Sequence, residues 1–188
     1  MRLPISLVAI LCAVCTGAAA SAQSTAVTKA PGISFSYDAQ HDQVIANNVQ
    51  LKATPMAAPT VAPTTGTLVV TINISDVSHF VKGTSYHCSV TAIGGELDTT
   101  NGVVSGGIDS AFGIAHWTGS SMLSCTVRIP YSWAILPDPA ATRGALLAFG
   151  VAAVTPSGAV EHSTLQVDGV EPLPASGATS TFTFDVTL

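Results

Sequence analysis

The sequence predicts an all-β protein, an antiparallel two-sheet sandwich of about seven or eight strands that is immunoglobulin-like in the broad sense. Short segments of alternating apolar and polar residues recur from Thr67 to Leu188, separated by turn-forming residues, and none has a helical period. Cys88 and Cys125 lie on the apolar faces of two such segments, and Trp117 lies between them in the chain. A jelly roll or a small barrel is the alternative arrangement of the same strands.

The N-terminus has the features of an export signal. Arg2 supplies a positive charge, residues 5–14 form an apolar run in which only Ser6 is polar, and residues 20–22 fit a small-x-small cleavage pattern before Gln23. The run is too short to span a bilayer, and no other stretch reaches about 18 consecutive apolar residues. We therefore expect a signal peptide over 1–22 and an extracellular, cell-surface or periplasmic protein without a membrane span once the signal is removed. A retained N-terminal anchor is the alternative.

The cysteine count points to one disulfide. Cys12 and Cys15 leave with residues 1–22, so Cys88 and Cys125 remain in the exported chain. Two cysteines in an oxidising compartment most simply pair, and closing a loop of about 37 residues contributes about 3–4 kcal/mol in the chain-entropy model. Two buried free thiols are the alternative. The separation lacks the paired spacing of a structural zinc site, and we expect neither a metal nor a cofactor.

Charge is sparse and shows no cluster of one sign. The chain has 6 basic and 11 acidic residues, so 9% of its residues are charged; a typical soluble domain has about 25%. Without a basic patch, nucleic acid and anionic membrane surfaces are not expected partners. An exterior of Thr, Ser, Gly, Ala and Asn, with little electrostatic repulsion, permits close packing of protein against protein.

Residues 23–66 are predicted to form a flexible N-terminal arm. Its second part, residues 53–66, is rich in Ala, Pro and Thr, a composition typical of an extended, solvated linker. Ile33, Phe35 and Tyr37 alternate with serines, so the alternative is that this segment adds as a strand to a sheet edge, in this molecule or in a neighbour.

The β-sandwich domain is predicted over 67–188. The segment 146–154 is apolar on both faces, which predicts a central strand. The turn after it has Pro156 at its second position and Gly158 at its fourth, a type I pattern that folds the chain back as a hairpin. The expected strands are 67–75, 85–93, 108–117, 123–129, 146–154, 159–167 and 181–188.

The strand 123–129 carries Cys125 on its apolar face, and Pro130 is expected to end it. Tyr131 and Trp133 follow the proline and share one parity, so we single them out as residues that contact a partner. Aromatic rings that cap the end of the sandwich core are the alternative explanation.

No motif predicts catalysis. A Gly-x-Ser-x-Gly elbow is absent from the sequence, nothing selects a pair of carboxylates for glycoside hydrolysis, and the histidines and acidic residues repeat no ligand spacing. We therefore expect a secreted or surface-exposed, non-catalytic protein with a structural, adhesive or assembly role, whose partner is protein, either another copy or a surface partner. The alternative is a carbohydrate or small-ligand binding module that uses Tyr131 and Trp133 to contact a glycan.

Overall fold

The computed structural model describes residues 27–30, 32–52 and 61–188, which form an all-β fold. No helix in these ranges is long and apolar enough to cross a membrane. The strands in chain order are β1 (Val27–Ala30), β2 (Ile33–Asp38), β3 (Gln43–Asn47), β4 (Gln50–Leu51), β5 (Thr64–Ser75), β6 (Ser85–Asp98), β7 (Val103–Ile114), β8 (His116–Trp117), β9 (Leu123–Trp133), β10 (Thr142–Val154), β11 (Val160–Glu171) and β12 (Thr179–Thr187).

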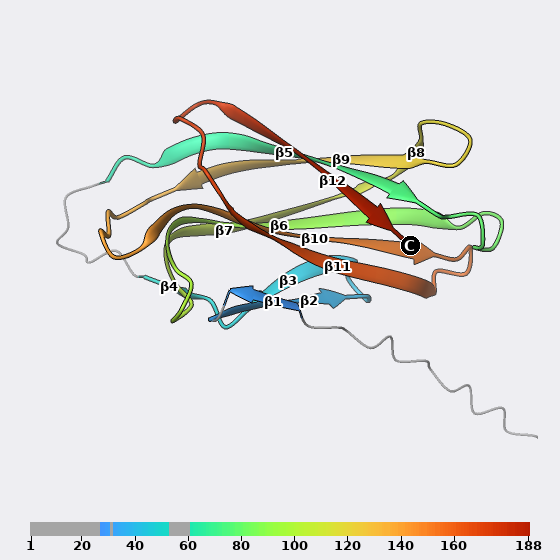
Figure 1. Cartoon of the computed structure of the whole chain (residues 1–188), viewed down its shortest axis with the longest axis horizontal. Helices are drawn as coiled ribbons and strands as arrows, with labels where there is room; N and C mark the ends of the chain where they lie inside the picture. Colours follow the sequence, from blue (N-terminus) through green and yellow to red (C-terminus); the bar gives the residue numbers. More distant parts are fainter. Residues whose placement is uncertain (1–26, 31, 53–60) are drawn as a thin grey trace, which may run out of the picture.

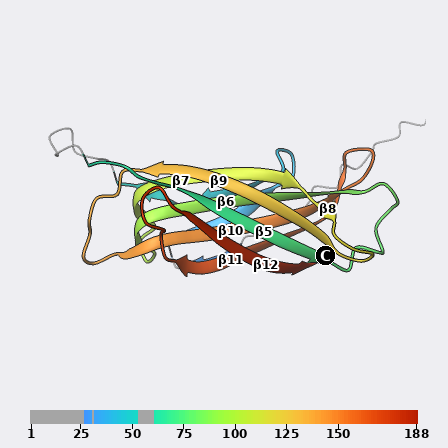
Figure 2. The same cartoon turned by 90° about the horizontal axis from the view of Figure 1, so that it is seen from above.

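The strands form three layers (Figure 1). The back sheet has the order β12-β5-β9-β8, the central sheet the order β11-β10-β6-β7-β4, and the arm sheet the order β1-β2-β3. The long strands of the back sheet lie over those of the central sheet (Figure 2). The two main sheets thus form the predicted sandwich, and no strand pairing joins them within the described ranges.

Both main sheets are mixed, so the prediction of purely antiparallel pairing is wrong. In the back sheet, β12 runs parallel to β5, with Thr179 beside Thr67 and Thr187 beside Ser75. In the central sheet, β4 runs parallel to β7 over two residues. The alternation of apolar and polar residues shows which side chains face the core, but it carries no information about the direction of a neighbouring strand.

The main core lies between the back and central sheets. Alternate residues of β5 and β9 meet the inward residues of β6 and β10 there, as the sequence pattern predicts. The largest side chains of this core that are almost wholly buried are Leu68, Ile72, Ile74, Leu123, Ile129 and Leu147.

A second core lies between the central sheet and the arm sheet. Its largest buried side chains are Ile33, Phe35, Val44, Ile93, Leu97 and Leu146. Because the central sheet is covered on both faces, residues 144–153 of β10 are all buried. The predicted central position of this strand is confirmed, since β10 lies between β6 and β11.

The described part of the N-terminal arm is ordered, in contrast to the flexible arm expected from its composition. Ile33 and Phe35 are fully buried and Tyr37 is 5% exposed. These residues pack on the face of the central sheet; only β4, over two residues, extends a sheet edge. The predicted signal peptide (1–22) and the first part of the linker (53–60) lie outside the described residues.

Candidate functional site

Tyr131 and Trp133 lie inside the main core, because β9 continues through Pro130 and ends only at Trp133. Their exposed fractions are 5% and 3%, so the expected exposed contact surface is not there. Pro130 pairs with Thr67, and beyond Ser124 strand β9 has a neighbour on one side only. A residue without an N–H is tolerated on such an edge, so the proline does not end the strand.

Trp133 fits against a pair of glycines in the central sheet. Gly94 and Gly107 are register partners on β6 and β7, and a Cβ built on Gly107 would lie 2.2 Å from Cδ1 of Trp133. The indole Nε1 donates a hydrogen bond of 2.6 Å to Oδ2 of Asp109, and the ring stacks on Tyr131 with centroids 4.2 Å apart. These contacts agree with the alternative interpretation of the sequence, in which the two aromatic rings cap the end of the sandwich core.

Cys88 and Cys125 come from opposite sheets and meet in the main core, with exposed fractions of 0% and 2%. The structure holds them as free thiols, so the predicted disulfide is not formed in it. Contact with Cys125, together with burial, raises the pKa of the Cys88 thiol. The expected inward orientation of both residues is confirmed, and the covalent bond stays a prediction.

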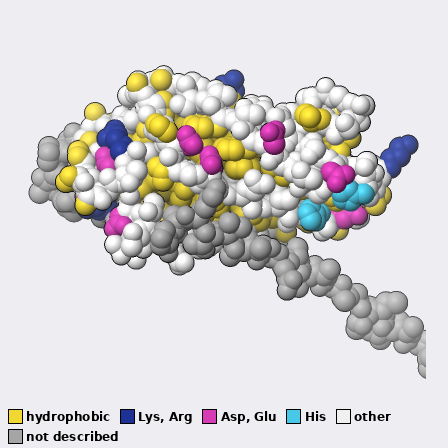
Figure 3. Space-filling view, viewed as in Figure 1, with side chains coloured by type: hydrophobic (Ala, Val, Ile, Leu, Met, Phe, Trp, Pro, Cys, Tyr) yellow, Lys and Arg dark blue, Asp and Glu magenta, His cyan; other side chains and the backbone are white. Residues whose placement is uncertain are grey.

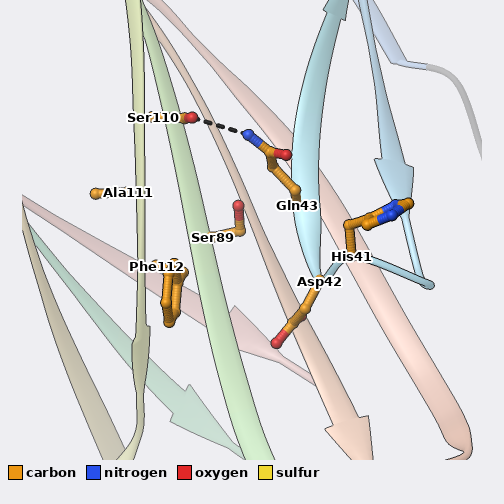
Figure 4. Close-up of a pocket in the computed structure, with 7 residues that line it drawn as sticks. All are labelled: His41, Asp42, Gln43, Ser89, Ser110, Ala111 and Phe112. Atoms are coloured by element: carbon orange, nitrogen blue, oxygen red, sulfur yellow. Dashed lines mark hydrogen bonds between the residues drawn. The ribbon is translucent and has the colours of Figure 1, made fainter.

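A groove lies between β3 and β7 on the outer face of the central sheet (Figure 4). Its floor includes Ser89 of β6, and Phe112 forms one wall. The turn between β2 and β3 forms the opposite wall. The hollow has a volume of about 280 Å³ and is lined by His41, Asp42, Gln43, Ser89, Ser110, Ala111 and Phe112. A second hollow of about 320 Å³ shares Gln43 and Ser110 and reaches Ile45 and Ile108, so the groove follows β3.

Polar contacts seat β3 on the central sheet beside this groove. The N–H of Val44 donates to Oγ of Ser89 at 2.9 Å, and Oγ1 of Thr91 donates to the carbonyl oxygen of Val44. Nε2 of Gln43 donates to Oγ of Ser110 at 2.9 Å across the groove (Figure 4). Ser89 and Thr91 are buried, so these bonds satisfy groups that water does not reach.

A chain of hydrogen bonds fixes the turn of the arm to β6. The carboxylate of Asp42 accepts from the hydroxyl of Tyr37 and pairs with Nδ1 of His87, whose Nε2 lies 3.1 Å from Oγ of Ser85. Asp42 has φ 53°, a left-handed conformation that Asp tolerates. Burial, followed by the bond to Asp42, raises the pKa of Tyr37.

The order Asp42, His87, Ser85 is that of a hydrolase triad, and sequence reasoning missed it because these residues are brought together only by the packing of the arm. A triad also needs a cavity for a substrate beside its serine. Neither Ser85 nor His87 lines the groove or the other hollows described here. We therefore interpret this chain of bonds as a tie between the arm and the central sheet.

Strand β7 presents a row of exposed apolar side chains beside the groove. Ile108, Phe112 and Ile114 lie on one face of the strand with exposed fractions of 37%, 78% and 55%. Ile45 of β3, at 38%, faces the same groove. Charged side chains are few on the face of the molecule shown in Figure 3. We call Ile108, Phe112 and Ile114 the β7 ladder.

A separate pocket lies at the end of the sandwich where β5 finishes and β8 begins. Its volume is about 270 Å³, and it is lined by Asp76, Val77, Ser78, Trp117, Ser120 and Ser121. Trp117 is 58% exposed, in contrast to the buried Trp133. The sequence indicated this tryptophan as part of a strand and gave no sign that it would be left in solvent.

In the part of the chain that the structure describes, no group of three or more His, Cys, Asp or Glu side chains is placed to hold a metal ion. No protein-family model matches the chain, and neither a curated protein nor a solved structure is significantly similar to it.

Proposed function

We propose that this protein is an exported, non-catalytic surface protein with an assembly role, and that a second copy of the chain adds to β7. The observation that carries the proposal is the coincidence of an open strand edge with the β7 ladder. One edge of β7 pairs with β6 along its length. Within the described residues, the opposite edge pairs with β4 only at Val103 and Val104, so no strand pairs with that edge from Ser105 to Ile114. An open edge beside exposed apolar side chains is a template for pairing with another strand.

The edge of β7 lacks the features by which soluble proteins protect such edges. Its single charged residue, Asp109, is bonded to Nε1 of Trp133. The other long edge strands are protected: β11 carries three acidic residues, β9 carries Arg128 and Pro130, and β12 presents threonines with Asp185. Charges and prolines on an edge oppose pairing, so β7 is the long edge most open to a partner.

The sequence of β7 favours pairing with itself. In an antiparallel pair centred on Ser110, Ile108 of each chain lies opposite Phe112 of the other, and Gly106 lies opposite Ile114. Two Ile–Phe contacts form on the same face, and aromatic pairs with β-branched residues stabilise antiparallel strands. A two-fold axis relates the copies, as in most homodimers, and the central sheets join into one.

The proposal also includes the location of the protein and the finer class of its fold. The predicted signal peptide supports an extracellular, cell-surface or periplasmic location. The two packed sheets, with Cys88 and Cys125 facing each other across the core, support an immunoglobulin-like arrangement in the broad sense. The sheets depart from purely antiparallel pairing where β12 runs parallel to β5 and where β4 runs parallel to β7.

The test is the oligomeric state of the purified protein, measured by light scattering and sedimentation from about 1 to 100 μM, a range that brackets micromolar dissociation constants. We expect a dimer that dissociates on dilution. Phe112→Lys is expected to raise the dissociation constant by about tenfold or more, because it places a charge where the ladder of the second copy packs.

The matched control is Val81→Lys, which adds the same charge at an exposed apolar residue of the loop between β5 and β6. We expect it to leave the dissociation constant unchanged. A protein that stays monomeric over the whole range, or dimers equally insensitive to both substitutions, contradicts the proposal.

A further inference from the structure

We infer that the pocket beside Trp117 binds a single neutral sugar unit of a glycan. This site is independent of the β7 edge, because it shares no lining residue with the groove and lies on the loops at one end of the sandwich. Figure 1 shows that the end of β5 and the strand β8 lie at the same end of the molecule.

The exposure of Trp117 is the first observation. An indole is among the largest apolar side chains, and burying one is strongly favourable, so 58% exposure leaves a large stabilising contact unused. The other tryptophan, Trp133, is 3% exposed. An indole that faces a hollow in this way offers a flat surface onto which the apolar face of a sugar ring stacks.

The polar lining is the second observation. Asp76 supplies a carboxylate, and Ser78, Ser120 and Ser121 supply hydroxyl groups. A carboxylate accepts hydrogen bonds from sugar hydroxyls, and serine hydroxyls both donate and accept. An aromatic wall with a few convergent polar groups is the usual composition of a small-ligand site.

The charges around the pocket select against acidic ligands. Among the described residues, neither lysine nor arginine lines it, and the carboxylate of Asp76 is 65% exposed. Nδ1 of His79 lies 3.9 Å from Oδ1 of Asp76. A phosphate, a sulfate or an acidic sugar would therefore meet a like charge without a fixed cation, so a neutral sugar is the class that fits.

Both walls of the pocket are held by bonds that do not involve a ligand. On one side, the hydroxyl of Tyr86 donates to the carbonyl oxygen of Val77 at 3.3 Å. On the other, the N–H of Thr118 donates to the carbonyl oxygen of Met122 at 3.0 Å. Walls that are already positioned lower the entropy lost on binding. The volume of about 270 Å³ is at the small end of ligand pockets and suits one ring.

The test uses a panel of neutral methyl glycosides of glucose, galactose, mannose and N-acetylglucosamine, with methyl glucuronide as the acidic probe. In the Trp133→Phe variant, Trp117 is the single indole, so its emission reports binding directly. We expect a saturable change with at least one neutral glycoside at concentrations up to about 10 mM, and none with the glucuronide.

Because Trp133 belongs to the core, its replacement can disturb the fold, so binding of the same glycosides is also measured by saturation-transfer NMR with Trp133 in place. In that background we expect Trp117→Ala to weaken binding by about tenfold or more, and Trp117→Phe, which keeps an aromatic face, to weaken it less. Asp76→Asn is expected to weaken binding by about tenfold, because a charge-assisted bond becomes a neutral one.

Leu51→Ala, at an exposed residue of β4 outside the pocket, is the control and is expected to change nothing. If no neutral glycoside gives a signal, if only the glucuronide binds, or if binding is unaffected by Trp117→Ala, the inference is overturned. None of these results depends on whether the protein forms dimers.

Discussion

At the scale of single residues, the position of Trp133 depends on two residues that have no side chain. Its ring occupies the space that a Cβ on Gly94 or Gly107 would fill. The bond from Nε1 to Asp109 then fixes the ring and satisfies the one polar atom of the indole. A glycine in a strand interior often marks such a close approach, and here the approaching group is an indole from the opposite sheet.

Gly107→Ala is therefore expected to lower the free energy of unfolding by about 1–3 kcal/mol, the cost typical of overpacking a core. The added methyl would lie 2.2 Å from Cδ1 of Trp133, a ring that is buried in the core. The measurement is denaturant unfolding followed by tryptophan fluorescence. Gly119→Ala is the control, since no heavy atom lies within 4 Å of the corresponding position, and it should leave the midpoint nearly unchanged. Equal effects of the two substitutions would contradict this account.

At the scale of elements, the arm sheet is attached by a buried tyrosine. Tyr37 is 5% exposed and donates to Asp42 in the next turn. Burial raises its pKa, so the folded protein keeps the phenol protonated at a pH where the unfolded chain has already released the proton. The unfolded state then binds fewer protons than the native state, and stability falls as the pH rises.

We expect the contribution of Tyr37 to decrease by about 1.4 kcal/mol per pH unit above about pH 10, the ordinary pKa of a tyrosine. Tyr37→Phe should reduce the slope of stability against pH between about pH 10 and 11, as measured by urea unfolding. The raised pKa values of Tyr86 and Tyr131 act in the same direction, so the comparison is between the variant and the unaltered protein. Parallel curves for the two proteins would show that Tyr37 is not responsible.

The strands of the sandwich could be predicted because the alternation of residues records burial on one face, as in β5 and the first part of β9. The end of β9 could not be predicted, because whether a proline ends a strand depends on whether its N–H side has a neighbour. The fold of the arm could not be predicted either. Ser89 and Thr91 are ordinary polar residues in the sequence, and only the structure shows that they bind the backbone of Val44.

The candidate site was largely hidden in the sequence for a related reason. Tyr131 and Trp117 are both aromatic residues in or near predicted strands, but one is 5% and the other 58% exposed. Exposure depends on which elements pack above a residue, and a single sequence does not contain that information. What could be predicted was the inward pair of cysteines, because the parity of a strand determines the face on which each residue lies.

At the scale of the whole molecule, Cys88 and Cys125 are placed to join the two main sheets covalently. Because residues 1–22 are predicted to form an export signal, we expect the pair to be oxidised in the exported protein. Mass spectrometry after alkylation in denaturant without reductant should then find neither thiol free. Complete alkylation of both would contradict the expectation.

Reduction of that bond is expected to lower the free energy of unfolding by about 3–4 kcal/mol, the chain-entropy value for a loop of about 37 residues. The measurement is urea unfolding with and without reductant. The control is the double variant Cys88→Ala and Cys125→Ala, whose stability should not respond to reductant. A matching response in the double variant would mean that the reductant acts elsewhere.

Because both faces of the central sheet are covered, the order in which the parts of the molecule can fold is constrained. The arm is the first described part of the chain to be synthesised, yet Leu146, Ala148 and Ala152 of β10 and Val167 of β11 belong to the surface on which it packs. The arm therefore has no finished docking surface until about a hundred further residues have emerged. When a chain emerges N-terminus first, the arm is therefore available before the surface that it covers, and it is among the last segments to pack.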